Sequence, residues 1–227
     1  MKSTTIKSHP AKFSDTILEA IKPYIPYEYV RILDPFAGTG KLKNIVNPNW
    51  LYLNEIQEEW AIQGKPANVT IGDTLFLPYA NKTFDMLITS PAFGNRMADH
   101  HFAKDKSKRN TYTHVLGHKL HLHNSGQMQW GEQYRKFHED AWIECYRVLK
   151  NDGFFLLNVS NHIRKGDEIF VSEWHLKFLT NCLGLKLLNH IMVETPRNRN
   201  GQHSDLRVAY ENIYILNKTI VLSEKND

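Results

Sequence analysis

The chain has 227 residues, of which 41% are hydrophobic and 23% charged, and its formal net charge is +4. This length and composition fit one α/β domain with its own core. No apolar run is long enough for a transmembrane helix and no secretory signal is visible, so we expect no membrane partner. Cys145 and Cys182 are expected to be buried thiols rather than a disulfide, which is typical of a cytoplasmic protein.

Apolar periodicity predicts alternating strands and helices. Ser14 is a typical N-cap for the first helix, and Asn151-Asp152-Gly153 is expected to end the long one. Strands that alternate with helices indicate an α/β, doubly wound, mostly parallel sheet of seven strands. The last two strands have no helix between them and are expected to pair antiparallel at one edge. Strands are predicted within residues 29–40, 49–56, 69–78, 83–91, 154–160, 185–195 and 211–218, and helices within 15–24, 131–150 and 171–184.

The first predicted strand runs into the glycine turn DPFAGTG, residues 34–40, which precedes a predicted helix. Gly38 and Gly40 allow the backbone to approach a ligand closely. Glu55 ends the second strand, 21 residues after Asp34, where this kind of fold holds ribose hydroxyls. These residues predict a nucleotide-type site at the carboxyl ends of the strands.

The third strand adds Asp73, whose carboxylate is an acceptor for an adenine amino group. Leu75 and Phe76 follow it and offer apolar contact to the ring. A single Gly-x-Gly is also typical of a simple tight turn. Glycines or acids at three successive strand ends favour a ligand site instead.

TSPAFGN, residues 89–95, follows the fourth strand and combines a hydroxyl, a proline, an aromatic ring and a glycine. The sequence resembles the S-adenosylmethionine-dependent amino-methyltransferases of DNA, from about residue 9 to residue 218. DPFAGTG is similar to their cofactor motif and TSPAF to their catalytic motif, a Ser, Asp or Asn followed by Pro-Pro and an aromatic residue. HPAKFSDTIL, residues 9–18, resembles the upstream segment that touches the methionine end of the cofactor. The departure is Ala92, where the family has a second proline.

The resemblance implies a class I methyltransferase fold and S-adenosylmethionine as cofactor. It implies catalytic roles for Ser90, Pro91 and Phe93. It implies cofactor contacts from His9, Lys12, Phe13, Asp34, Phe36, Gly38, Gly40, Glu55, Asp73 and Leu75.

An exocyclic amine is a poor nucleophile because its lone pair is delocalised into the base. Two acceptors aimed at its N–H groups favour a pyramidal nitrogen, and Ser90 Oγ and the Pro91 carbonyl offer them. Phe93 is expected to stack on the flipped base, which is worth roughly 1–3 kcal/mol. A neutral serine suffices because the nitrogen becomes acidic once it is methylated.

The insertion between Gly94 and Trp130 holds six Lys or Arg against two acids, a net charge equal to that of the whole chain. Such density indicates a polyanion partner. Tyr112 or Trp130 is expected to fill the gap that a flipped base leaves. Six histidines lie here, but their spacing matches no common zinc site, so no metal is expected. The predicted nucleic-acid contacts are Arg96, Lys104, Lys106, Lys108, Arg109, Arg197 and Arg199.

We therefore expect residues 1–227 to form one methyltransferase domain that acts on duplex DNA with a flipped base. By the same family resemblance, serine at position 90 favours N4 of cytosine as the target, with N6 of adenine close behind. The alternatives are an RNA amino-methyltransferase and an inactive nucleic-acid-binding protein of the same fold. A specificity partner, a homodimer and a cognate restriction enzyme all remain open.

Overall fold

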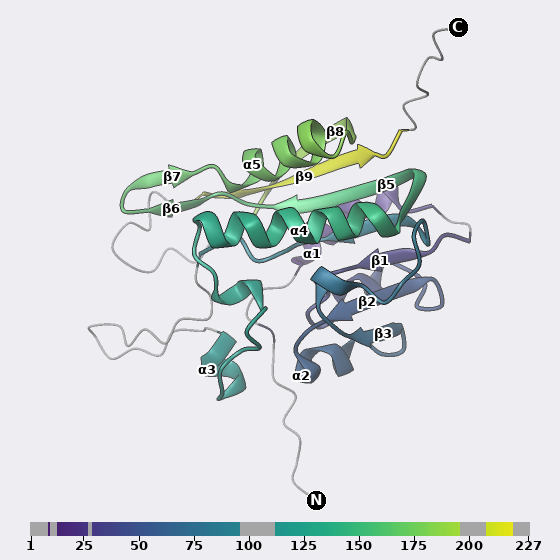
Figure 1. Ribbon diagram of the computed structural model, residues 1–227, viewed down its shortest axis with the longest axis horizontal. Helices are drawn as coiled ribbons and strands as arrows, with labels where there is room; N and C mark the ends of the chain where they lie inside the picture. The colour runs from purple at the N-terminus through teal and green to yellow at the C-terminus, as the bar shows by residue number, and fades with distance from the viewer. Residues whose placement is uncertain (1–8, 10–12, 27–28, 96–111, 196–207, 220–227) are drawn as a thin grey trace, which may run out of the picture.

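The computed structural model describes residues 9, 13–26, 29–95, 112–195 and 208–219. Its main sheet has seven strands in the order β3-β2-β1-β4-β5-β9-β8 (Figure 1). The first five strands pair in parallel, and β9 runs antiparallel to both of its neighbours. The predicted doubly wound, mostly parallel sheet is confirmed. The strands are β1 (Ile32–Asp34), β2 (Leu51–Glu55), β3 (Asn68–Ile71), β4 (Phe84–Thr89), β5 (Leu149–Val159), β8 (Lys186–Glu194) and β9 (Tyr210–Asn217).

Helices cover both faces of the sheet (Figure 1). Helices α4 (Glu132–Val148) and α5 (Val171–Lys177) pack on one face, and α1 (Asp15–Ile21) packs on the other. Within the described residues, no helix is both long and apolar enough to cross a membrane. The shorter helices are η1 (Lys22–Tyr24), η2 (Lys41–Asn44), α2 (Glu58–Ala61), η3 (Ile62–Gly64), η4 (Thr74–Phe76), α3 (Tyr112–Leu116), η5 (Ser125–Gln127) and the π-helical turn η6 (Phe178–Cys182).

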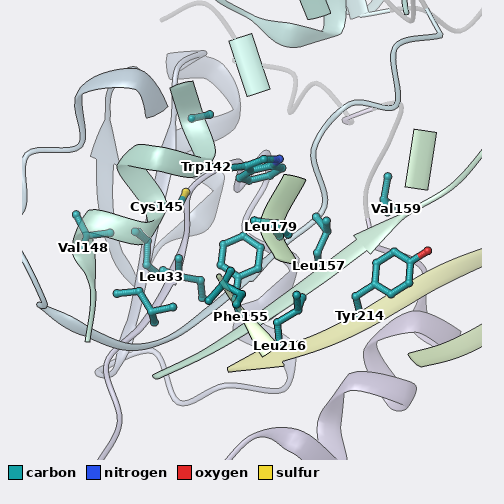
Figure 2. Close-up of a cluster of buried hydrophobic side chains, with 14 of the residues drawn as sticks. Leu33, Trp142, Cys145, Val148, Phe155, Leu157, Val159, Leu179, Tyr214 and Leu216 are labelled. Carbon is teal, nitrogen blue, oxygen red and sulfur yellow. The ribbon is translucent and has the colours of Figure 1, made fainter. Parts of the chain in front are cut away.

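The central strands bury side chains on both faces, because successive residues of a strand point to opposite sides. Leu33 and Phe155 pack with Trp142 of α4, whereas Ile32 and Leu156 pack on the α1 side. Figure 2 shows the first of these two clusters, with Trp142 lying over the sheet residues. Full burial of a Leu or Phe side chain contributes about 1.5–3 kcal/mol. Helix α4 is therefore held firmly against the strands whose ends carry the predicted site.

Local signals gave correct boundaries where a cap was present. Ser14 Oγ accepts a hydrogen bond from Ile17 N (3.2 Å), as expected of the N-cap of α1. Cys145 is a buried free thiol, as predicted, but Cys182 is exposed and that prediction is wrong. Cys182 lies in the last turn before Gly184, where the chain leaves the helix with a φ of +71°.

Three details differ from the sequence-based expectation. The helix predicted after the glycine turn is only the short η2, because Pro48 disfavours helical backbone at the residue before it. Residues 151–153 lie within β5 rather than before it, at an irregularity where Asp152 takes a φ of +61°. A hairpin of β6 (His162–Arg164) and β7 (Asp167–Ile169) was not predicted, because each strand has only three residues.

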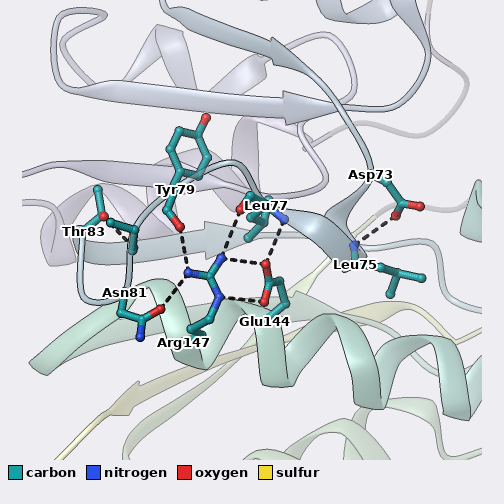
Figure 3. Close-up of polar contacts among 9 residues, drawn as sticks. Asp73, Leu75, Leu77, Tyr79, Asn81, Thr83, Glu144 and Arg147 are labelled. Carbon is teal, nitrogen blue, oxygen red and sulfur yellow. Dashed lines mark hydrogen bonds and ion pairs between the residues drawn. The ribbon is translucent and has the colours of Figure 1, made fainter.

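Arg147 of α4 ties the connection between β3 and β4 to that helix (Figure 3). Its guanidinium donates to Leu77 O (3.0 Å), Tyr79 O (2.7 Å) and Asn81 Oδ1 (2.9 Å). It also forms a two-pronged ion pair with Glu144, at 2.7 and 2.8 Å. Glu144 Oε1 in turn accepts from Leu77 N (2.9 Å). This connection begins next to Asp73, so the clamp restrains one strand end of the predicted site.

The clamp predicts that Arg147→Lys lowers the free energy of unfolding by about 1–3 kcal/mol, because lysine keeps the charge but loses the planar fork of donors. Urea denaturation measures this value. Lys136→Ala, which removes an exposed ion pair with Asp140 on the same helix, is the control and is expected to leave stability unchanged. Equal stability of Arg147→Lys and the unchanged protein would contradict the clamp.

Candidate functional site

A pocket lies at the carboxyl ends of the parallel strands. It brings together residues from five predicted segments: the upstream segment, the glycine turn, the two acidic strand ends and the TSPAF motif. Ligands of open α/β sheets bind at this edge. The predicted residues that line the pocket are His9, Phe36, Glu55, Asp73 and Ser90.

Glu55, at the end of β2, is held by the turn that follows β1. Its Oε2 accepts from Gly38 N (2.8 Å) and its Oε1 from Gln57 N (2.9 Å). Burial raises the pKa of Glu55 to about 7, although these hydrogen bonds oppose the shift. Gly38 has a φ of +52°, and a Cβ there would lie 3.3 Å from the His9 ring. Glycine, His9 and the acid therefore meet tightly at one point of the pocket wall.

Asp34 lies beneath the pocket and is fully buried. Its Oδ1 accepts from Phe36 N (3.1 Å) and from Thr89 Oγ1 (2.8 Å). Its Oδ2 is buried and has no hydrogen-bond partner within the part of the chain that the structure describes. Burial, opposed by these two hydrogen bonds and aided by the nearby charge of Glu55, raises the pKa of Asp34 to about 7. The Thr89 contact joins the DPFAGTG turn to the residue that precedes Ser90.

Asp73 follows β3 and caps η4, with Oδ1 accepting from Leu75 N (3.0 Å). Its Oδ2 lies 2.5 Å from His123 Nδ1. Leu75 is half-buried against the α4 side of the core, outside the pocket lining, and Phe76 is 75% exposed. Among the described residues, apolar lining of the pocket comes instead from Phe36, Ile56, Trp60, Ala92, Tyr112 and Phe137.

Ser90 and Ala92 line the same pocket as the two acids. Ser90 Oγ accepts from Asn158 Nδ2 (3.2 Å), which also donates to Glu211 Oε2 (2.7 Å). A hydroxyl oxygen has two lone pairs, so this contact orients Ser90 and leaves it a further acceptor position. Pro91 is buried, and Phe93 is half-buried against the core beside α4 rather than in the pocket lining.

Residues 112–128, hereafter the covering segment, pack against the pocket and α2. His118 Nε2 lies 2.6 Å from Glu59 Oε1, and His121 N donates to Gln57 Oε1 (2.8 Å). A small apolar cluster supports these contacts through Trp60, Tyr112, Leu116 and Leu120. The covering segment contributes three pocket residues that sequence reasoning missed, His123, Asn124 and Ser125, and also Tyr112, for which a contact with DNA was predicted.

This packing changes the view of the insertion. Tyr112 is only 4% exposed and contacts the rings of His9 and Trp60, so it does not present a free ring to DNA. Trp130 is half-buried, with the Arg135 guanidinium 5.6 Å from its ring centre. Leu116 and Leu120, four residues apart in a polar stretch, were the sequence signal for a packed segment. In the described ranges no group of three His, Cys, Asp or Glu side chains is arranged to hold a metal ion.

Two further residues predicted to contact the cofactor, Phe13 and Gly40, lie outside the pocket lining and pack in the structure around it. Phe13 is buried in the α1 core. Gly40 allows the turn to lie close to β2 and η3, because a Cβ there would lie 2.5 Å from Leu53 Cδ1. The remaining predicted site residues lie outside the described residues: Lys12, Arg96, Lys104, Lys106, Lys108, Arg109, Arg197 and Arg199.

Comparison with known proteins decides the family. Residues 84–225, which include TSPAF and the strands behind it, match the family model described as DNA methylase. The chain belongs to the DNA methylase family. No curated protein matches the sequence.

Solved structures match this chain at low identity. A SAM-dependent methyltransferase from Aquifex aeolicus is 13% identical over 90% of both chains, with a TM-score of 0.52. TrmN from Thermus thermophilus is 14% identical over 89% of this chain and 48% of its own, with a TM-score of 0.54. A putative methyltransferase complexed with the Haloferax volcanii activator Trm112 is 11% identical over 90% of both chains, at 0.55. These likenesses show the fold, which is the predicted class I methyltransferase fold.

The raised pKa of Asp34 predicts that the ligand-free protein loses stability as the pH rises from about 4 to about 8. The folded state holds this proton up to about pH 7, whereas the unfolded state releases it near its ordinary value of 3.8. Asp34→Asn keeps the Oδ1 acceptor and removes the charge. Its unfolding free energy should therefore fall less over this range, by on the order of 4 kcal/mol.

Urea denaturation at a series of pH values measures both profiles. Asp85→Asn is the control. Lys150 and Arg31 N hold the pKa of Asp85 below its ordinary value, so Asp85 adds stability as the pH rises, whereas Asp34 removes it. Parallel profiles for Asp34→Asn and the unchanged protein would contradict the raised pKa, because ionising Asp34 would then cost no folding free energy.

Proposed function

We propose that this DNA methylase transfers a methyl group from S-adenosylmethionine to an exocyclic amine of a base flipped out of duplex DNA. N4 of cytosine is the favoured target and N6 of adenine is second. One observation carries the proposal: Glu55, Asp73 and Ser90 line a single pocket, although they come from three different strand ends.

S-adenosylmethionine is the cofactor of the DNA methylase family, and solved structures of the same fold are SAM-dependent methyltransferases. The residues present fit this molecule. Glu55 and Asp73 offer carboxylate acceptors for ribose hydroxyls and for the adenine amino group. Asp34 Oδ2, which has no hydrogen-bond partner among the described residues, and the Gly38 turn beside His9 are the candidates for the methionine end. When bound, the cofactor supplies a sulfonium methyl group as the electrophile.

The protein's own contribution is to hold the amine and direct its lone pair. Ser90 Oγ, oriented by Asn158, accepts one N–H of the amine, and the Pro91 carbonyl accepts the other. Both contacts favour a pyramidal nitrogen whose lone pair faces the methyl group. Alignment of this kind lowers a barrier by up to about 7–11 kcal/mol. The cofactor, held by Glu55 and Asp73, would supply the methyl group and leave as the neutral thioether, and the proton of the methylated nitrogen would pass to water.

The basic residues between 96 and 109, together with Arg197 and Arg199, are proposed to neutralise DNA phosphates. The covering segment is not proposed to contact DNA, because it packs against α2 and the pocket. We propose that the recognition sequence is short or that a partner supplies the specificity. A second copy of the chain would serve the same purpose.

Transfer of tritium from labelled S-adenosylmethionine tests the function directly. Duplex DNA, structured RNA and no nucleic acid are offered in parallel, and modified nucleosides are identified by mass. We expect label in DNA as N4-methylcytosine. Label in RNA alone would show that the substrate is RNA and not DNA. A protein that binds the cofactor but labels neither nucleic acid would contradict the proposed methyl transfer.

Two substitutions are expected to have opposite effects on binding and turnover. Ser90→Ala should leave cofactor affinity within about twofold and lower kcat roughly 100-fold, because an acceptor for the amine is lost. Asp73→Asn keeps the acceptor for Leu75 N but turns donors toward the adenine amino group. It should weaken cofactor binding about 10-fold or more. Calorimetry with S-adenosylhomocysteine and single-turnover kinetics measure the two quantities. Loss of cofactor binding in Ser90→Ala would mean that the motif is assigned to the wrong ligand.

A further inference from the structure

A buried chain of hydrogen bonds runs from the helical core to the TSPAF loop. Trp142 Nε1 donates to His175 Nδ1 (2.9 Å), and His175 Nε2 lies 2.9 Å from the Tyr134 hydroxyl. That hydroxyl donates to the Ala92 carbonyl (2.7 Å). The side chains of Trp142, His175 and Tyr134 are fully buried. The chain ends on the residue that stands where the second proline of the motif is missing.

The donors allow only one direction through this chain. An indole nitrogen is a donor only, so the neutral His175 ring accepts at Nδ1 and carries its proton on Nε2. Burial keeps His175 neutral by lowering its pKa and keeps Tyr134 protonated by raising its pKa. His175 therefore donates to the Tyr134 oxygen, and the Tyr134 proton points to Ala92. Hydrogen bonds in series polarise and strengthen one another.

The same loop is held a second time two residues later. Gly94 O accepts from Trp130 N (2.7 Å), and Gly94 has a φ of +68°. A Cβ at Gly94 would lie 3.1 Å from Trp130 N, so the backbones are packed closely here. Ala92 is thus held through its own carbonyl, and Gly94, two residues later, is held by Trp130. A proline would instead restrict this position through its ring.

We propose that Tyr134, backed by His175 and Trp142, is a positioning residue that holds the Ser90–Gly94 loop in place of the missing second proline. The effect on methyl transfer rests on the proposed function. The effect on the loop does not. Among the described residues that line the pocket, Ala92 is present and Tyr134 is not, so Tyr134 acts through the Ala92 carbonyl.

Tyr134→Phe removes the hydroxyl and leaves the ring. Tyr79→Phe is the matched control, because it also removes a hydroxyl hydrogen bond, to Thr70 (2.9 Å), but away from this loop. In Tyr134→Phe we expect amide hydrogen exchange in residues 89–95 to become several-fold faster. We expect kcat to fall about 10-fold, with the Kd of S-adenosylhomocysteine within about twofold. Tyr79→Phe should change neither.

The double variant Ala92→Pro with Tyr134→Phe supplies a rescue. Proline should restore part of the lost kcat and slow the exchange again, and it should have little effect on the protein with Tyr134 intact. Unchanged loop exchange in Tyr134→Phe would overturn the positioning role, whatever the activity. Absence of rescue would overturn the claim that the hydroxyl replaces proline. Faster loop exchange in a protein that methylates neither DNA nor RNA would reject the proposed function and support the positioning role.

Discussion

The hydrogen bond from Thr89 Oγ1 to Asp34 Oδ1 is the interaction on which the site depends. It joins the ends of β1 and β4, so the glycine turn and the TSPAF loop start at a fixed distance from each other. The same carboxylate oxygen accepts from Phe36 N and sets the start of the turn. Because Asp34 is fully buried, water does not compete for these contacts, and the cost of burying the carboxyl appears in its raised pKa.

Helix α4 holds the opposite side of the site. Near its end, Arg147 restrains the connection that follows Asp73, and near its start, Tyr134 restrains the loop that follows Ser90. The helix itself is locked to the sheet through Trp142 and its neighbours in the core (Figure 2). A rigid element thus sets the spacing between a cofactor acceptor and a substrate acceptor. Catalysis by alignment requires such spacing to be kept within fractions of an ångström.

The strands and the acids at their ends were predictable because both follow from local pattern. Strand-forming residues precede Glu55 and Asp73, and these acids stand where that pattern stops, although β3 at the sheet edge is exposed or half-buried. The covering segment was not predictable as a pocket wall. Its contacts with Gln57, Glu59 and Asp73 join residues about 50–65 positions apart, and its polar composition resembles that of a solvated loop. Asn158 and Tyr134 were missed for the same reason, since their partners lie in other elements.

A crystal structure of the protein with S-adenosylhomocysteine tests the central claim most directly. The account predicts the ribose hydroxyls on Glu55, the adenine amino group on Asp73, and the sulfur facing Ser90 with an open path between them. The nucleoside in any other position, or a sulfur walled off from Ser90, would contradict it.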